Sequence, residues 1–468
     1  MSHDFTDRKS MDRDIGRAAD ALARYRVALA RDPEPMADVD PLFAFRHVSG
    51  KNAYEAIAGS KIADPDDPAR LTWVHALTEA RVVRDLDVEW ATCANEKAAK
   101  LEVGVPRLVS WREAWRGIVA SPARSEAIGW LGAAAERGPA LASIARQRAE
   151  RRVEVARRLG LTHPSDGHAL PMADLTVAAE LLLRETNDLA RQAFREARRK
   201  ADIQELAVSP VDAIAIAVGR DAPEGWPAHL NERWLSELFA SFARGLRIEL
   251  SPLPEAIGAA SFARGLQAFG YAMRRGGRTP SLSFVAASSP QFVDAHRYAW
   301  VFGSLAASPA FQKRALDLSS RVVAGQTRAL ARTSLFAARI AAATFLLGDP
   351  MRPVAQDRFE ETTDALFGIP APIGLAGAWP APHDDEPARF LALMTALPLE
   401  QDLVNRFDLD WFKNPRAVAF LRARASGPAR DFETPQEDEK EKGEGAPPSL
   451  DAAAAARALA RRFESVLA

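Results

Sequence analysis

The feature that most constrains this chain is the helical spacing of its apolar residues, which recurs along almost the whole sequence. In the stretch 14–29, Ile15, Ala18, Leu22 and Tyr25 follow one another at intervals of three and four, as on one face of an α-helix. Runs of alternating β-branched residues, which are typical of half-buried strands, are nearly absent. The pattern therefore predicts an all-α fold.

The same spacing predicts further helices that are separated where Pro or Gly interrupts it. Gly160 is expected to end one of these helices in the left-handed conformation, and Asp174 is expected to cap the helix that follows. The predicted helices cover residues 71–100, 125–135, 138–159, 174–200, 230–246, 254–275, 292–307 and 310–347.

Composition agrees with a large soluble protein and argues against several classes of partner. The 468 residues are 47% hydrophobic and 26% charged, which is ordinary for globular domains. The net charge of -1 provides no overall field that would draw the protein to nucleic acid or to an anionic membrane. The Arg-rich stretch 145–158 is interrupted by Glu150 and Glu154 and has no interleaved aromatics, so we interpret it as a solvated face.

Several features point to a cytoplasmic location. Cys93 is the only cysteine, so no disulfide can form within the chain, and residues 1–13 lack the apolar core of a secretory signal. The most apolar run, 335–347, is too short to cross a bilayer and contains Arg339. Ten of the 61 basic residues are Lys and 51 are Arg, which together with the abundant Ala is typical of a GC-rich bacterial genome.

The histidines do not form a recognisable zinc motif. The chain has no His-Glu-x-x-His sequence, in which two imidazoles would leave one helical face beside a general-base carboxylate. His163 and His168 flank Pro-Ser-Asp-Gly, which predicts a solvated turn, with a metal site as the less favoured alternative. We predict neither a metal nor another cofactor.

The C-terminal residues differ from the body. Residues 431–448 are rich in Glu, Lys, Gly and Pro and predict a flexible acidic linker. In residues 449–468, Leu459, Phe463 and Leu467 are spaced by four and predict an amphipathic helix. This helix either folds back onto the body, which we favour, or docks on a partner. The predicted regions are then 1–150, 151–430, 431–448 and 449–468.

Part of the chain resembles a known family. From about Arg152 to Leu421, the order and spacing of several segments are similar to zinc metallopeptidases of the thimet oligopeptidase and oligoendopeptidase F type, which are almost wholly helical gluzincins. The segment Gly265-Leu266-Gln267-Ala268-Phe269-Gly270-Tyr271-Ala272-Met273 lies where that family has His-Glu-x-Gly-His-Ala-Leu, starting at Gln267. The segment Asp294-Ala295-His296-Arg297-Tyr298-Ala299-Trp300 lies where the family has the helix with its third ligand, a Glu. The resemblance implies a large helical fold with a central channel.

The departures from the family motif bear directly on chemistry. By this resemblance, Gln267 replaces the first His, Ala268 replaces the general-base Glu and Tyr271 replaces the second His, while the third ligand falls at Asp294 or His296. Gln is a poor zinc ligand and Ala has no carboxylate to activate water. The sequence therefore indicates that zinc–water chemistry has been lost.

These observations support three hypotheses. The leading one is a non-catalytic relative of zinc oligopeptidases, a pseudopeptidase that holds a peptide or protein partner in its cleft and has no catalytic residues. The candidate cleft-lining residues are Gln267, Ala268, Tyr271, Asp294, His296 and Tyr298, with Arg264, Arg274 and Arg275 as nearby positive charges.

The alternatives come from other classes. One is a helical interaction protein that acts through its C-terminal linker and helix. The other keeps catalysis, as an active metallopeptidase-like hydrolase with non-standard ligands. A different form of catalysis would use His296 with Asp294, or His229 with Glu232, as an acid–base pair on a small substrate. The oligomeric state is left open.

Overall fold

The computed structural model is built almost entirely from helices, which confirms the all-α prediction. It describes residues 7–60, 64–168, 170–200, 208–220, 222–244, 258–279, 281–349, 355–379, 386–429 and 451–467. Within these ranges the sheet is a single antiparallel pair, β1 (Ala99–Leu101) with β2 (Arg107–Val109). The predicted helix 71–100 therefore ends earlier, at Asn95, and the chain turns into this hairpin.

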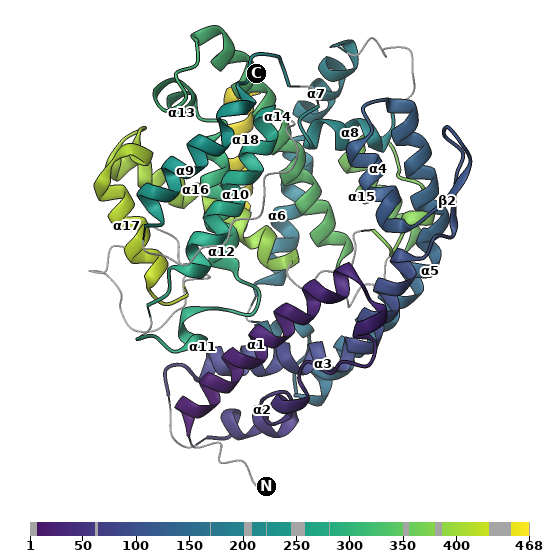
Figure 1. Cartoon of the computed structure of the whole chain (residues 1–468), viewed down its shortest axis with the longest axis vertical. Coiled ribbons are helices and arrows are strands. Elements are labelled where there is room, and N and C mark those ends of the chain that lie inside the picture. The colour runs from purple at the N-terminus through teal and green to yellow at the C-terminus, as the bar shows by residue number, and fades with distance from the viewer. Residues whose placement is uncertain are drawn as a thin grey trace.

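The N-terminal helices form one end of the molecule, at the bottom and right of the view in Figure 1. Their core joins apolar residues of the first three helices with Val285 from a distant segment. These elements are α1 (Arg8–Arg31), η1 (Glu34–Met36), η2 (Phe43–Val48), α2 (Lys51–Ala58), α3 (Asp67–Asn95), α4 (Trp111–Ala120), α5 (Arg124–Arg158) and η3 (Pro164–His168).

The remaining helices form the larger part of the molecule around α14, which runs through its centre (Figure 1). They are α6 (Met172–Glu185), α7 (Asn187–Lys200), α8 (Pro210–Ala217), η4 (Ala228–Leu230), α9 (Asn231–Phe242), α10 (Gly258–Gly276), α11 (Phe284–Ala287), α12 (Val293–Leu305), α13 (Pro309–Arg314), α14 (Ser320–Leu347), α15 (Gln356–Phe367), η5 (Ile373–Leu375), α16 (Glu386–Phe407), η6 (Trp411–Lys413), α17 (Pro415–Ser426) and α18 (Ala452–Leu467).

The predicted helix 174–200 is divided at Thr186, and a buried arginine explains why. The guanidinium of Arg339 on α14 donates to the Leu183 carbonyl at 2.8 Å and to the Thr186 hydroxyl at 2.6 Å. A buried guanidinium needs such acceptors, and the break between α6 and α7 leaves carbonyl groups free to accept. Asp174 also lies inside the first turn of α6, whose N-cap is Pro171, so the predicted cap was wrong.

The two helices predicted on either side of Gly138 are one continuous helix, α5, which passes through Pro139. Pro139 has no N–H to donate to the carbonyl four residues earlier, at Ala135. Gly374 of η5 packs against that carbonyl so closely that a Cβ at position 374 would lie 2.2 Å from its oxygen. As predicted, the helix ends before Gly160, which has a φ of +78°. The predicted boundary between residues 150 and 151 falls within α5.

Helix α14 is long and apolar enough to cross a membrane, but 72% of its most apolar window is buried inside the protein. Arg339, in the middle of this helix, is 1% exposed and bonded to neighbouring helices. Helix α14 is therefore mostly enclosed by other parts of the protein.

The C-terminal helix α18 packs on α6, α14 and α16. It buries Leu459, Phe463 and Leu467, the apolar stripe recognised in the sequence. The structure therefore has the fold-back arrangement of this helix. The predicted linker, 431–448, lies outside the described residues.

Candidate functional site

The two helices that carry the resemblance, α10 and α12, pack against each other along their length. Two glycines allow the close approach. A Cβ at Gly270 would lie 2.4 Å from the Tyr298 carbonyl oxygen, and a Cβ at Gly303 would lie 2.5 Å from Cγ of Gln267. The segments predicted to form one site are therefore neighbours in space.

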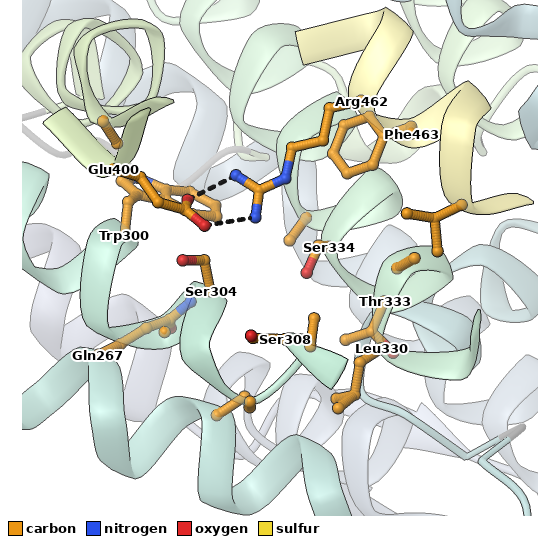
Figure 2. Close-up of a pocket in the computed structure, with 18 of the residues that line it drawn as sticks. Gln267, Trp300, Ser304, Ser308, Leu330, Thr333, Ser334, Glu400, Arg462 and Phe463 are labelled. Carbon is orange, nitrogen blue, oxygen red and sulfur yellow. Dashed lines mark hydrogen bonds and ion pairs between the residues drawn. The ribbon is translucent and has the colours of Figure 1, made fainter. Parts of the chain in front are cut away.

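Gln267 lines a cleft beside these helices, at the position where the family resemblance places the first zinc-binding His. Figure 2 shows its side chain on the cleft wall, near Ser304 of α12. Ala268, at the position of the general base, is exposed and is not among the residues that line this cleft.

Tyr271 and His296 lie together, but away from the cleft lining. Their ring centroids are 4.9 Å apart, and Phe292 lies 6.4 Å from Tyr271. The guanidinium of Arg275 stacks over the ring of Phe292 at 4.4 Å. These residues form a half-buried aromatic group at the N-terminal end of α12.

Asp294 is held in a buried cluster of arginines. Its Oδ2 accepts from Nε of Arg274 and its Oδ1 accepts from Nη1 of Arg297, each at 2.8 Å. Burial by itself would raise the pKa of Asp294, but the charges of Arg297, Arg274 and Arg424 outweigh it and hold the pKa below its ordinary value. Both carboxylate oxygens are thus already engaged by arginine.

Tyr298 is fully buried and its hydroxyl donates to the Leu421 carbonyl at 3.0 Å. Burial raises the pKa of Tyr298 above its ordinary value, so the phenol stays neutral. Of the six candidate residues, only Gln267 is on the cleft wall, and a binding role for the other five stays a prediction.

The second pair proposed for acid–base chemistry, His229 with Glu232, is exposed on η4 and at the start of α9. The first pair, His296 with Asp294, has its carboxylate bonded to arginines as described above. Neither pair lies among the residues that line the cleft.

The cleft has a volume of about 410 Å³ and a largely apolar wall of small residues. This is within the range of pockets that hold small organic ligands or short peptide side-chain groups. Its walls come from α8, α10, α12, α14, α16 and α18 (Figure 2). The polar groups that face it include Gln267, Ser304, Ser308, Thr327, Thr333, Ser334, Glu400 and Arg462.

The C-terminal helix closes one side of this cleft. Arg462 of α18 donates both terminal nitrogens to the carboxylate of Glu400 on α16, at 2.5 and 2.8 Å, as Figure 2 shows. Phe463 adds its ring to the same wall. Helix α18, whose Arg462 lies about 50 residues after the end of α16, thus completes the cleft. The sequence analysis did not predict this role for the C-terminal helix.

Two polar atoms in the cleft lining are buried without a hydrogen-bond partner in the described part of the chain. They are Nε of Arg264 and Oγ1 of Thr327. Burial lowers the pKa of the Arg264 guanidinium relative to its ordinary value, although a guanidinium remains charged at neutral pH. Unsatisfied buried polar groups are rare in folded proteins, and a ligand that supplies an acceptor is one way to satisfy them.

The described residues contain one group of three side chains suited to a metal ion, and it is not at α10 or α12. It consists of His75 and Glu79 on α3 with His168 on η3, and all three are buried. Burial lowers the pKa of His75 to about 4. Burial alone would raise the pKa of Glu79, but Arg152 and the two histidines lower it to about 2.

This group corrects two sequence predictions. His168 was expected in a solvated turn, but it is 6% exposed and its Nε2 lies 3.2 Å from Oε2 of Glu79. The Arg-rich face of α5 is only partly solvated, because Arg148 bonds to Asp87 at 2.6 Å and Arg152 contacts Glu79. The i,i+4 spacing of His75 and Glu79 was a signal in the sequence, but the contribution of His168 depends on the tertiary fold.

Among solved structures, the chain is similar to a putative peptidase from Chlamydophila abortus, with a TM-score of 0.57 and 10% sequence identity. The similarity covers 89% of this chain and 81% of that one. No protein-family model matches the chain, and no curated protein matches it. At this identity the likeness concerns the fold alone.

Proposed function

We propose that the protein is a pseudopeptidase, a non-catalytic relative of zinc oligopeptidases, which binds a peptide segment in its cleft without cleaving it. The observation that carries the proposal is Gln267. It lies on the wall of the cleft, at the position where the family resemblance requires a zinc-binding His. An amide side chain can hydrogen-bond to a peptide backbone, but it is a poor ligand for zinc.

The cleft lining supports peptide as the ligand class. Its apolar walls suit hydrophobic side chains, while Gln267, Ser304 and Thr327 offer donors and acceptors for a peptide backbone. Arg264 adds a cation whose Nε has no partner among the described residues. A free C-terminal carboxylate or an acidic side chain of the peptide would supply the missing acceptor.

Fluorescence anisotropy with unstructured peptides tests this proposal. We expect a peptide with a free C-terminal carboxylate to bind, and Arg264→Gln to weaken its binding about tenfold, since charged hydrogen bonds contribute about 1.5–3 kcal/mol. Arg233→Gln is the matched control, because Arg233 is exposed and pairs with Glu237 on the same helix. Equal binding by both variants, or loss of intact peptide during the incubation, would contradict the proposal.

The position of α18 favours a second candidate function. Because this helix forms one wall of the cleft, its release would expose the apolar residues of α6, α14 and α16 to a partner. In that case, removing residues 430–468 would abolish partner binding, whereas a cleft-binding protein would still bind peptide, with altered affinity. We place either function in the cytoplasm.

A further inference from the structure

We propose that His75, Glu79 and His168 form a binding site for a divalent transition metal, with Zn²⁺ as the first candidate. The site lies between α3 and η3, in the N-terminal part of the molecule, and is separate from the cleft. It does not depend on the proposed peptide binding, and either inference can fail alone.

The distances suit one ion shared by three ligands. One potential ligand atom from each side chain lies within 4.8 Å of the others. His168 Nε2 is 3.2 Å from Oε2 of Glu79, and His75 Nε2 is 3.6 Å from Oε1 of Glu79. Around tetrahedral zinc, with bonds of about 2.1 Å, ligand atoms are separated by about 3.4 Å. Two imidazoles and one carboxylate are also a usual protein ligand set for zinc.

The histidines have buried nitrogens that the described residues leave without hydrogen bonds. Neither ring nitrogen of His75 has a hydrogen-bond partner, and the same is true of Nδ1 of His168. His75 is 0% exposed. A buried polar atom without a partner is destabilising and rare in folded proteins, so its persistence calls for an ion or a water molecule at the site.

The orientation of His75 identifies the nitrogen that would bind. Nε2 is the ring nitrogen that lies near Glu79, 3.6 Å from its Oε1. Gly167 packs closely against the ring, since a Cβ at position 167 would lie 2.5 Å from Cγ and Nδ1 of His75 and 2.7 Å from Cδ2. The absence of a side chain at Gly167 allows η3 to bring His168 close to α3, with the two imidazole centroids 4.7 Å apart.

Arg152 is the charge that opposes metal binding, and it does not occupy the site fully. Its Nε and Nη2 lie 3.4 and 3.5 Å from the two oxygens of Glu79, at the long end of hydrogen bonding. A carboxylate has about four lone-pair positions, so Glu79 can contact Arg152 and a metal together. Repulsion from the guanidinium is expected to weaken the site, and this gives the proposal a specific test.

A small cavity of about 20 Å³ lies against His168 and Arg152 and is lined on its other sides by His163, Asp349 and Glu386. That volume holds about one water molecule. The metal would thus have three protein ligands, with water as the source of a fourth.

The test measures metal rather than activity. The full chain, stripped with a chelator, is dialysed against Zn²⁺, and bound zinc is determined by elemental mass spectrometry and by competition with a chromophoric chelator. We expect one zinc per chain. His75→Ala and His168→Ala are each expected to weaken binding more than about 100-fold, because loss of a ligand should exceed the 10–100-fold effect of losing an outer-shell partner.

Matched variants separate the site from general histidine binding. His229→Ala removes an exposed histidine on η4, away from the site, and should leave the affinity unchanged. Arg152→Gln should tighten binding about tenfold, since it removes a nearby positive charge. Circular dichroism checks that each variant is folded.

Cobalt substitution of the unmodified chain needs no variant. We expect visible ligand-field bands typical of four-coordinate Co²⁺. Absence of zinc from the unmodified protein, or equal zinc binding in folded His75→Ala and His168→Ala variants, would overturn the proposal and leave a buried ion-pair network only.

Discussion

Two buried clusters of ionisable side chains differ in how completely their members are satisfied. Around Asp294, two arginines on α10 and α12 bond to both carboxylate oxygens at 2.8 Å, and Arg297 also donates to Thr395. Around Glu79, the nearest arginine contacts are longer than 3.3 Å and both histidines retain unpartnered nitrogens. In the first cluster the carboxylate itself is fully bonded, although Nε and Nη2 of the nearby Arg424 have no hydrogen-bond partner among the described residues. In the second cluster the histidine nitrogens that could bind a metal are unused.

This difference separates the capacity to bind metal from the helices where the resembling family binds it. The resemblance places a metal ligand at Asp294 or His296, but the Asp294 carboxylate is already bonded to arginines. The side chains able to hold a metal in the described part of the chain lie instead on α3 and η3. Ligand capacity thus depends on whether neighbouring groups have already engaged the donor atoms, and residue type alone does not determine it.

Asp294→Ala should have the largest effect of the changes considered. It leaves the buried Arg274 and Arg297 without their carboxylate, and breaking a buried ion pair costs about 3–5 kcal/mol. Urea unfolding measures the loss. Asp410→Ala is the control, because its pair with Arg314 is exposed and should contribute no more than about 1 kcal/mol. Equal losses would show that the bonds of the Asp294 carboxylate do not stabilise the fold as described.

Acid should lower the free energy of unfolding, partly because it protonates the Asp294 carboxylate. The pKa of Asp294 is lower in the folded chain than its ordinary value of 3.8, so its stabilising contribution is complete above that pH. The contribution is lost as the pH falls below 3.8 toward the lower folded pKa. The free energy of unfolding should therefore decrease with acid over this range, and Asp294→Asn should show a shallower decrease. An identical slope in both proteins would contradict this assignment.

The next largest loss of stability is expected from substitutions of the glycines between α10 and α12. Gly270→Ala places a Cβ 2.4 Å from the backbone oxygen of Tyr298, which cannot move without shifting α12. We expect a loss of about 1–3 kcal/mol in thermal or urea unfolding, as for other overpacked cores. Gly303→Ala is the control, since its Cβ meets the flexible side chain of Gln267. A larger loss at Gly303 than at Gly270 would disagree with this packing.

Glu400→Gln tests the contact that holds α18 over the cleft. The pair with Arg462 is bidentate but partly exposed, with side-chain exposures of 19% and 34%. We expect a loss of about 1 kcal/mol or less. Limited proteolysis followed by mass spectrometry should show faster cleavage near α18 and unchanged cleavage elsewhere. Uniformly faster cleavage would indicate global destabilisation instead.

The smallest effect is expected at His75 in the metal-free protein. Since neither ring nitrogen has a hydrogen-bond partner among the described residues, His75→Leu should change the free energy of unfolding by less than about 1 kcal/mol. In the presence of Zn²⁺ the same change should remove the stabilisation that bound metal gives. A large loss without metal would mean that His75 belongs to a satisfied network, as Asp294 does.

The sequence was sufficient for the fold class and for much of the helix pattern. Periodicity identified α1 and the apolar stripe of α18, and Gly160 correctly marked the end of α5. These features depend on local spacing and on the backbone freedom of glycine. The break at Thr186 was missed because its cause, Arg339, comes from a helix about 150 residues away.

The candidate site was predictable only in part. The family resemblance brought attention to Gln267, which does line the cleft, but apolar spacing gave no sign that Asp294 would be enclosed by arginines. The i,i+4 pair His75 and Glu79 was visible in the sequence. His168 joins them only through the packing of η3 on α3, which no local pattern specifies.

The central claim is that the cleft beside Gln267 holds peptide and leaves it intact. Mass spectrometry of a peptide recovered from its complex with the zinc-supplemented protein, after prolonged incubation, tests this most directly. The account predicts a 1:1 complex from which the full-length peptide is released. Fragments that accumulate with time, and no longer form when Gln267 is replaced by Ala, would contradict it.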